Sequence, residues 1–279
     1  MIDIVRTVDD LRVRVGNWRK QGLRVGLVPT MGALHAGHLS LAERSLELTD
    51  RTVATLFINP RQFGEGEDLE SYPRNEESDG EKLGAAGVHL LFAPGVEEMY
   101  PVDFVTGVKV GDLGEVLEGT YRPGFFDGVA TVVCKLLNQA AADTAFFGEK
   151  DYQQLLVIRR MARDLNIPTV IEGVETVREV DGLALSSRNV YLSAEERSAA
   201  PTLYKTICEV ASKVRAGGDI SVLEAWGRDQ VLAAGFASVD YLSVHDAETL
   251  APLTERDRPG RVLTAAKLGR ARLIDNVPV

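Results

Sequence analysis

The chain has 279 residues, of which 45% are hydrophobic and 26% charged, the composition of an ordinary globular protein large enough for two domains. Its formal net charge of −10 at pH 7 argues against a nucleic-acid partner, because binding to the phosphate backbone needs a cationic surface. No run approaches the roughly 18 apolar residues of a membrane helix, and the start of the chain lacks a secretion signal, so we expect a cytoplasmic protein with no membrane partner.

Apolar, β-prone runs alternate with stretches of helical periodicity over the first part of the chain. In chain order, strands are predicted at residues 23–28, 52–58, 88–92, 144–147 and 169–171, and helices at 39–50, 75–86, 127–141 and 152–166. This alternation predicts an α/β fold with a Rossmann-like, doubly wound parallel sheet that has helices on both faces.

The rest of the chain predicts a smaller C-terminal α+β domain. Two helices are expected at residues 194–215 and 221–234, followed by strands at 238–244, 261–266 and 272–275. We place the domain boundary so that the first domain comprises residues 1–186 and the second comprises residues 187–279.

The most informative stretch is residues 28–39, VPTMGALHAGHL, where a predicted strand runs into a Gly-rich turn that opens a helix. A helix N-terminus presents unpaired N–H groups and the positive end of the dipole, which stabilise a polyphosphate. Gly32 and Gly37 allow the backbone to approach phosphates, and His35 and His38 are expected on one helical face, where both can donate to phosphoryl oxygens. The alternative is that His35 merely caps the loop and His38 packs at the helix start.

Polar blocks directly follow three of the predicted strands, at residues 30–38, 59–63 and 148–151. Ligands of open α/β sheets bind outside the carboxyl ends of the strands, so these blocks are expected to form one nucleotide site. Within it, Lys150 can hold the β- and γ-phosphates and Asp151 a ribose hydroxyl. An isolated Gly-Glu-Lys-Asp would, however, more often be a solvated helix cap.

Residues 28–39 resemble the H-x-G-H motif of the nucleotidyl-transfer superfamily that includes the class I aminoacyl-tRNA synthetases, and the longer string PTMGALHxGH resembles the pantoate–β-alanine ligase family in particular. Further blocks match that family in the same order: FINPRQF at 57–63, YRPG at 121–124, FGEKDYQQ at 147–154 and DGLALSSRN at 181–189. The C-terminal part of the chain carries no independent motif.

The resemblance implies ATP-dependent condensation of (R)-pantoate with β-alanine through a pantoyl adenylate, with release of AMP and pyrophosphate. It implies that residues 1–186 bind ATP and pantoate, that residues 187–279 form a lid, that ATP is used with Mg²⁺, and that the protein is a homodimer. No metal ligand is assigned. Glu76, Glu77 and Asp79 begin a predicted helix, where acids also complement the dipole, and phosphates and water hold most of the Mg²⁺ shell in such sites.

The resemblance also assigns site residues. His35, His38, Lys150 and Arg188 are expected to be catalytic. The residues assigned to ATP are Met31, Gly32, His35, Gly37, His38, Gly148, Lys150, Asp151, Val177, Leu185, Ser186, Ser187 and Arg188. Those assigned to pantoate or β-alanine are Met31, Asn59, Gln62, Arg122 and Gln154. Many family members carry histidine where this chain has Phe125, so any polar role of that histidine is absent or taken over here.

Two other functions stay open. A nucleotidyltransferase of the same fold that joins AMP or CMP to a phosphorylated acceptor needs more cations at the acceptor site than Gln62 and Gln154 provide. A nucleotide-binding regulatory module without turnover has no use for the paired glutamines together with the histidine pair. An assay with ATP, Mg²⁺, pantoate and β-alanine that scores AMP against ADP separates the three.

Overall fold

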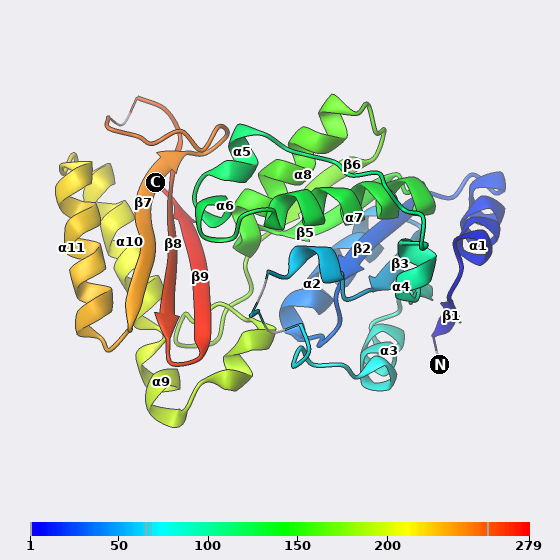
Figure 1. Cartoon of the computed structure of the whole chain (residues 1–279), viewed down its shortest axis with the longest axis horizontal. Coiled ribbons are helices and arrows are strands. Elements are labelled where there is room, and N and C mark those ends of the chain that lie inside the picture. The colour runs from blue at the N-terminus through cyan, green and yellow to red at the C-terminus, as the bar shows by residue number, and fades with distance from the viewer. Residues whose placement is uncertain (1, 65, 68, 256) are drawn as a thin grey trace. The chain divides into compact units, whose positions relative to one another are not determined.

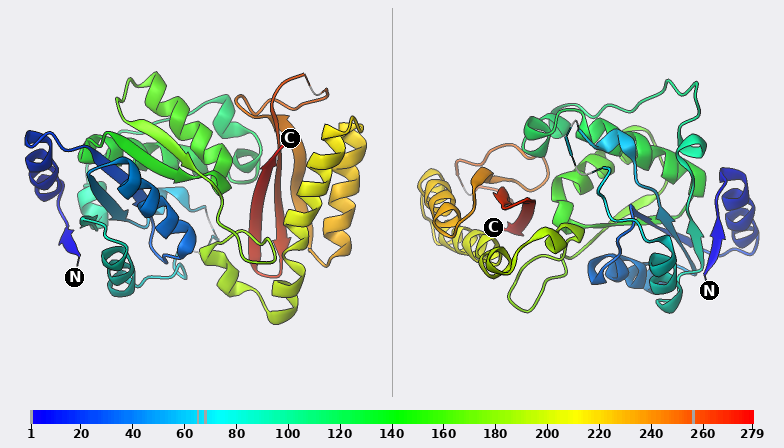
Figure 2. Two further views of the ribbon diagram at one scale, coloured as in Figure 1. Left: turned by 180° about the vertical axis from the view of Figure 1, so that it is seen from behind. Right: turned by 60° about the horizontal axis from the view of Figure 1, so that its bottom comes forward.

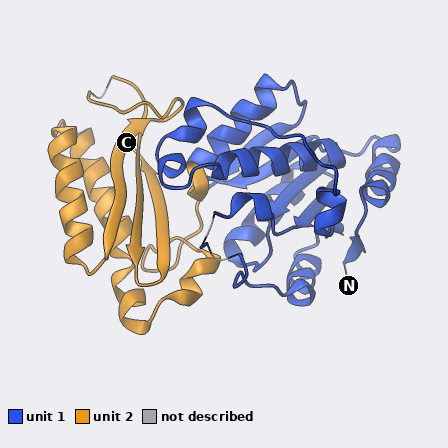
Figure 3. Cartoon of the chain, in the orientation of Figure 1, with its two compact units in different colours: residues 1–149, 153–175 blue, residues 150–152, 176–279 orange. Residues whose placement is uncertain are grey.

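The computed structural model describes residues 2–64, 66–67, 69–255 and 257–279. The chain divides into two compact units (Figure 3): unit 1 comprises residues 1–149 and 153–175, and unit 2 comprises residues 150–152 and 176–279. The short segment 150–152 therefore belongs to unit 2 by its contacts, although it is flanked in the sequence by elements of unit 1. Residues 176–186 also belong to unit 2, whereas the sequence prediction placed them in the first domain.

Unit 1 contains the predicted doubly wound parallel sheet, which confirms the fold class (Figure 1). Its strand order is β1-β4-β3-β2-β5-β6, and all its pairings are parallel. The strands are β1 (Asp3–Val5), β2 (Val25–Thr30), β3 (Arg51–Leu56), β4 (Leu90–Phe92), β5 (Thr144–Gly148) and β6 (Val170–Val174). From β2 the chain winds toward β3 and β4, and from β5 toward β6, so the strand order reverses between β2 and β5. This switch point is where open α/β sheets bind ligands.

Helices cover both faces of this sheet, as the two views of Figure 2 show. Helix α7 contacts α1 and β2, whereas α2 contacts α3 and lies along β2, β3 and β5. The helices of this part of the chain are α1 (Val8–Lys20), α2 (Ala36–Leu48), α3 (Glu76–Ala85), α4 (Val96–Met99), α5 (Asp112–Glu115), α6 (Glu118–Tyr121), α7 (Phe125–Ala140) and α8 (Tyr152–Asp164), with 3₁₀ turns η1 (Pro60–Gln62) and η2 (Glu149–Asp151).

The sequence prediction missed β1, α1 and the three one-turn helices α4, α5 and α6. Strand β1 has three residues, too few to show an alternating pattern. Helix α1 is mainly polar and buries only Leu11 and Val15, one turn apart, and its start is capped by the Thr7 side chain, which accepts from the Asp10 N–H. The sequence does carry apolar residues at helical spacing here, at Val8, Leu11, Val15 and Trp18, and the sequence prediction overlooked them.

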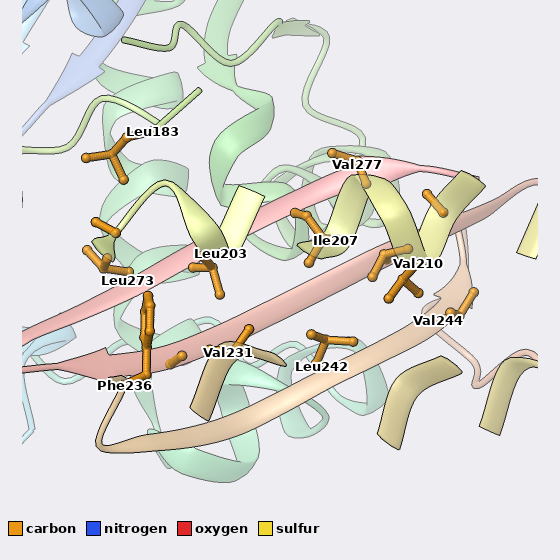
Figure 4. Close-up of a cluster of buried hydrophobic side chains, with 14 of the residues drawn as sticks. Leu183, Leu203, Ile207, Val210, Val231, Phe236, Leu242, Val244, Leu273 and Val277 are labelled. Carbon is orange, nitrogen blue, oxygen red and sulfur yellow. The ribbon is translucent and has the colours of Figure 1, made fainter. Parts of the chain in front are cut away.

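Unit 2 is the predicted smaller α+β part. Its antiparallel sheet has the order β7-β8-β9, formed by Ser238–Asp246, Gly260–Leu268 and Ala271–Pro278. Helices α10 (Thr202–Arg215) and α11 (Ile220–Ala233) cover one face, and Figure 4 shows side chains such as Ile207, Val231 and Leu242 meeting there in one apolar cluster. Two further elements, η3 (Ser187–Tyr191) and α9 (Ala194–Ala199), precede them.

The prediction of a single helix over residues 194–215 is wrong, because the structure has two helices separated at Pro201. Proline has no N–H to donate to the preceding turn, so α9 ends at Ala199 and α10 begins at Thr202. No helix among the described residues is long and apolar enough to cross a membrane.

Buried His245 on β7 predicts that the folded chain loses stability in mild acid. Its Nδ1 lies 2.8 Å from the carbonyl oxygen of Leu250 and so must carry the proton, while Nε2 lies 2.9 Å from the Ser243 hydroxyl. Burial lowers the pKa of His245 below its ordinary 6.5. The unfolded chain therefore binds more protons below pH 6.5 than the folded chain, and the free energy of unfolding falls as the pH drops through that range.

Urea unfolding at neutral pH and at about pH 5.5 measures this effect. His245→Asn keeps an N–H donor for Leu250 but cannot be protonated, so its unfolding free energy is expected to change less between the two pH values than that of the unaltered chain. Lowered carboxyl pKa values such as that of Asp246 act below 3.8, outside this window. An equal change of unfolding free energy between the two pH values in both proteins would contradict the role given to His245.

Candidate active site

His35 and His38 lie where β2 passes into α2, at the switch point of the sheet. The structure corrects one expectation: only His38 lies within the helix, because His35 precedes it as the N-cap, although the two rings lie side by side. The Nδ1 atom of His35 accepts from the Gly37 N–H at 3.1 Å, and the Nδ1 atom of His38 accepts from the His35 N–H at 3.4 Å. The ring centroids are 4.1 Å apart.

This reciprocal cap has a chemical consequence. A neutral imidazole that accepts at Nδ1 carries its proton on Nε2, so both rings hold the tautomer with an Nε2–H donor. The capping role of His35 is therefore real, and it is compatible with donation to a phosphate. The cap orients the two rings, and the helix N-terminus adds its own N–H groups and dipole.

The turn between β2 and α2 is clamped by Asp79 from the first turn of α3. The Asp79 side chain is only 1% exposed, and its two oxygens accept from the N–H groups of Ala33 and Leu34 at 2.8 and 2.9 Å. Lys82 donates to the Leu34 carbonyl oxygen at 2.9 Å. Gly32 and Ala33 have φ values of +92° and +53°, a region unfavourable for alanine, so this backbone conformation needs such support.

Buried Asn59, 1% exposed, is hydrogen-bonded to Gln62, another of the residues predicted to bind pantoate or β-alanine. Its Nδ2 donates to Gln62 Oε1 at 3.0 Å and to the Gly128 carbonyl oxygen at 3.1 Å. The Gln62 Nε2 in turn lies 2.9 Å from the sulfur of Met31, in the turn that leads to His35. Asn59 therefore fixes the orientation of the Gln62 amide, and Gln62 contacts the turn between β2 and α2 through Met31.

Tyr100 supports this cluster and was missed by the sequence analysis. Its hydroxyl donates to Asn59 Oδ1 at 2.9 Å, and burial raises the pKa of Tyr100 to about 12, which keeps the hydroxyl protonated as a donor at physiological pH. The two residues are 41 positions apart. Nothing in the local pattern around Tyr100 signals this contact.

Arg122, also predicted to bind pantoate or β-alanine, lies beside Gln62 and forms an ion pair with Glu67. Its Nε and Nη2 donate to the two oxygens of Glu67 at 2.7 and 2.6 Å, and Nη2 also donates to the Gln62 carbonyl oxygen at 3.2 Å. The guanidinium carbon lies 3.7 Å from the ring centroid of Phe125. Phe125, where the family often has histidine, therefore acts here as an apolar stacking surface for Arg122.

Gln154 is less clearly connected to this cluster. It is half-buried on the first turn of α8, and no hydrogen bond among the described residues joins it to Asn59 or Gln62. Its neighbour Gln153 is buried and structural, since its Nε2 donates to the carbonyl oxygens of Leu113 and Val116 at 2.8 Å each. The assignment of Gln154 to a substrate stays a prediction.

Lys150 and Asp151 follow Gly148, the last residue of β5, but belong to unit 2. The Lys150 ammonium lies 3.7 Å from the Asp151 carboxylate, and its side chain is 19% exposed. The main chain here is bonded to the sheet of unit 2, because Asn276 Nδ2 donates to the Lys150 carbonyl oxygen at 2.9 Å. The main chain of Lys150, just after the carboxyl end of β5, is therefore held by a hydrogen bond from β9.

Val177 and Leu185 are the two ends of a hairpin in unit 2 that leads into Ser186. The Leu185 N–H donates to the Val177 carbonyl oxygen at 3.0 Å. Arg178 fastens the hairpin to β9 through two bonds of 2.6 and 2.8 Å to the buried carboxylate of Asp275, and its guanidinium stacks 3.7 Å from the ring centroid of Tyr204. A paired, buried guanidinium of this kind makes the hairpin a rigid support.

Ser186, Ser187 and Arg188 begin the turn η3 directly after the hairpin. The Ser186 hydroxyl accepts from the Arg188 N–H at 3.3 Å, and Asn189 Nδ2 donates to the Ala184 carbonyl oxygen at 3.1 Å. The helix that begins at Ala194 has its own cap in Ser193, so the Ser186 cap belongs to η3. It also brings the serine pair and Arg188 onto one short turn.

The described residues can be tested for side chains that could ligate the predicted Mg²⁺. No three His, Cys, Asp or Glu side chains in the described part lie close enough together to hold a metal ion. Both oxygens of Asp79 accept from main-chain N–H groups, and Glu76 pairs with Arg6. This set fits a Mg²⁺ ion that arrives on the phosphates of ATP and keeps several waters, rather than one held in a protein cage.

Known proteins match this chain over its full length. The family model for pantoate-beta-alanine ligase matches residues 3–278. The chain is 58% identical over 278 residues to the pantothenate synthetase of Paramagnetospirillum magneticum, covering 100% of this chain and 98% of that protein. It is 54% identical over 279 residues to the pantothenate synthetase of Cereibacter sphaeroides, with 100% of each covered.

Two solved structures match as well. The crystal structure of pantothenate synthetase from Thermus thermophilus matches with a TM-score of 0.94 and 49% identity, over 99% of each chain. The pantoate-beta-alanine ligase of Francisella tularensis, complexed with beta-gamma ATP and beta-alanine, matches with a TM-score of 0.84 and 30% identity, over 99% of this chain and 97% of that one. The chain therefore belongs to the pantoate–β-alanine ligase family.

Proposed function

We propose that this chain condenses (R)-pantoate with β-alanine at the expense of ATP, forming pantothenate, AMP and pyrophosphate through a pantoyl adenylate. The observation that carries the proposal is the contact of 2.9 Å between Gln62 Nε2 and the Met31 sulfur, which joins an uncharged, Asn59-oriented amide to the His35–His38 turn. An uncharged amide suits the hydroxyl groups of pantoate, while the turn suits phosphate.

In the first step, an oxygen of the pantoate carboxylate attacks the α-phosphorus of ATP. A P–O bond to the acid forms, the bond to the β-phosphate oxygen breaks, and pyrophosphate leaves. We propose that the Nε2–H groups of His35 and His38 and the N-terminus of α2 stabilise the charge that grows on the phosphoryl oxygens. Gln62 would orient the acid, with Met31, Asn59, Arg122 and Gln154 completing the substrate site.

Further residues are proposed to bind the nucleotide. Lys150 and Arg188 supply positive charge to the phosphates, Ser186 and Ser187 supply hydroxyl donors, and Asp151 accepts from the ribose. The full ATP-binding set then comprises Met31, Gly32, His35, Gly37, His38, Gly148, Lys150, Asp151, Val177, Leu185, Ser186, Ser187 and Arg188. Mg²⁺ is proposed to enter with ATP and to neutralise part of the phosphate charge.

In the second step, the amine of β-alanine attacks the carbonyl carbon of the adenylate. A C–N bond forms, the bond from that carbon to the AMP oxygen breaks, and the amine nitrogen loses a proton. No side chain becomes covalently attached, so catalysis rests on positioning and charge stabilisation. We also propose a cytoplasmic homodimer, which sedimentation of the purified protein would test.

Isotope transfer tests the proposed chemistry. With ¹⁸O in the carboxylate of pantoate, attack at the α-phosphorus places one labelled oxygen in AMP after the amine has displaced it. Label in inorganic phosphate, with ADP as the nucleotide product, would overturn the adenylate route and the residue roles derived from it. A nucleotidyltransferase of the same fold would instead leave AMP or CMP attached to its acceptor.

Arg188→Ala is expected to affect the two steps unequally. If Arg188 binds the triphosphate, its loss slows adenylate formation far more than the reaction of supplied pantoyl adenylate with β-alanine, because pyrophosphate has already left in the second step. Pre-steady-state measurement of each half-reaction gives the ratio. Equal losses in both would indicate a general disturbance of the turn that Ser186 caps.

A further inference from the structure

The segment 150–152 is held by the sheet of unit 2 at three points. Asn276 on β9 donates to the Lys150 carbonyl oxygen at 2.9 Å. The Tyr152 hydroxyl donates to the Ala247 carbonyl oxygen at 2.8 Å, just after β7. The guanidinium carbon of Arg261, on β8, lies 3.8 Å from the centroid of the Tyr152 ring.

Asn276 is suited to hold a backbone in place because its own position is fixed. It is 4% exposed, and it lies opposite Leu263 in the antiparallel register of β8 and β9. Its neighbour Asp275 binds Arg178 of the hairpin that leads to Ser186. Asp275 and Asn276, adjacent on β9, therefore hold the two segments of unit 2 that contain predicted phosphate ligands: the hairpin before Ser186 and the segment 150–152.

Fixing the main chain matters for a lysine in particular. Its ammonium stands on a flexible four-carbon stem, so the cost of placing the charge is mostly conformational entropy. In this chain the stem is largely buried, with 19% of the Lys150 side chain exposed, and Asp151 lies 3.7 Å from the ammonium. With the stem confined, the position of the ammonium depends also on the peptide at Lys150, which Asn276 holds by its hydrogen bond.

We propose that Asn276, assisted by Tyr152, is a positioning residue that sets the backbone of Lys150 for the adenylation step. The inference rests on the proposed function, in which Lys150 binds the phosphates of ATP. Asn276 does not touch a substrate in this proposal and acts only through the Lys150 carbonyl oxygen. Its contribution must therefore disappear when the Lys150 side chain is absent.

The experiment is a double-mutant cycle on pantoate-dependent exchange of pyrophosphate into ATP, measured on the full chain. Asn276→Asp keeps the size of the side chain but removes the N–H donor, and is expected to slow exchange about tenfold, the usual scale of one lost hydrogen bond. In a Lys150→Ala background the same substitution should have no further effect. Thr264→Val is the matched control, since it removes a buried hydrogen bond of 3.0 Å from β8 to the Tyr241 carbonyl oxygen, one that does not involve residues 150–152.

The outcomes separate the inference from the proposed function. An Asn276→Asp rate like that of Thr264→Val, or a loss that persists in full without the lysine side chain, would overturn the role of Asn276. If Asn276→Asp does not fold, Tyr152→Phe decides, because it keeps the ring beside Arg261 and removes only the bond to Ala247. Its loss must likewise vanish in the Lys150→Ala background. Absence of any exchange by the unaltered chain would instead overturn the proposed function, and the inference with it.

Discussion

Replacing His38 with alanine is expected to lower turnover about 10²- to 10³-fold, the usual scale for one donor that stabilises charge in a transition state. The Nδ1 atom of His38 accepts from the His35 N–H, so the ring carries its proton on Nε2 and presents it as a donor. Steady-state rates of AMP formation measure the loss. Thermal unfolding should change little, because α2 keeps the cap that the His35 side chain gives to the Gly37 N–H.

His38→Glu is the matched control for the capping contact. Glutamate at this third helical position restores the acceptor for the N-cap N–H in a capping box, and its charge complements the helix dipole. It cannot donate to phosphate and repels it. The variant should therefore be as stable as the unaltered chain, yet no more active than His38→Ala. Recovery of activity in His38→Glu would assign His38 to helix capping alone.

Asp79→Ala is expected to reduce both the free energy of unfolding and the turnover. The Asp79 carboxylate accepts from two main-chain N–H groups and has no proposed contact with a substrate. Removing the carboxylate leaves the buried N–H of Leu34 and the half-buried N–H of Ala33 without their acceptor, at a cost of about 2 to 4 kcal/mol of unfolding free energy. The released turn carries the histidine pair, and a displacement of about 1 Å costs roughly 10²-fold in rate. Urea unfolding and AMP formation measure the two effects.

Glu77→Ala serves as its control, since Glu77 lies in the same first turn of α3 but is not buried. It should lose only the small favourable interaction of an acid with the helix dipole. If Asp79 were instead a simple metal ligand, Asp79→Ala would raise the Mg²⁺ concentration needed for activity and leave the unfolding free energy at the level of Glu77→Ala. That result would contradict the proposal that Asp79 stabilises the turn between β2 and α2.

The sequence by itself determined the architecture where the pattern is strong. The buried parallel strands β2 and β3 consist almost entirely of apolar and small residues, and α7 repeats apolar positions through four turns, so periodicity alone located them. The placement of residues 30–38 after β2 follows from the same local signal. The family was recognisable because five motif blocks keep their order along the chain.

Only the tertiary structure decided which side chains hold these motifs in place. Asp79 bonds to a turn 45 and 46 residues away, Tyr100 to Asn59 at a separation of 41, and Asn276 to Lys150 at 126. The helix periods of a sequence report on neighbours within one or two turns, and strand alternation reports on one face of one strand. A hydrogen bond between a buried polar side chain and a distant main-chain atom leaves no such trace, because its partner is set by the packing of whole elements.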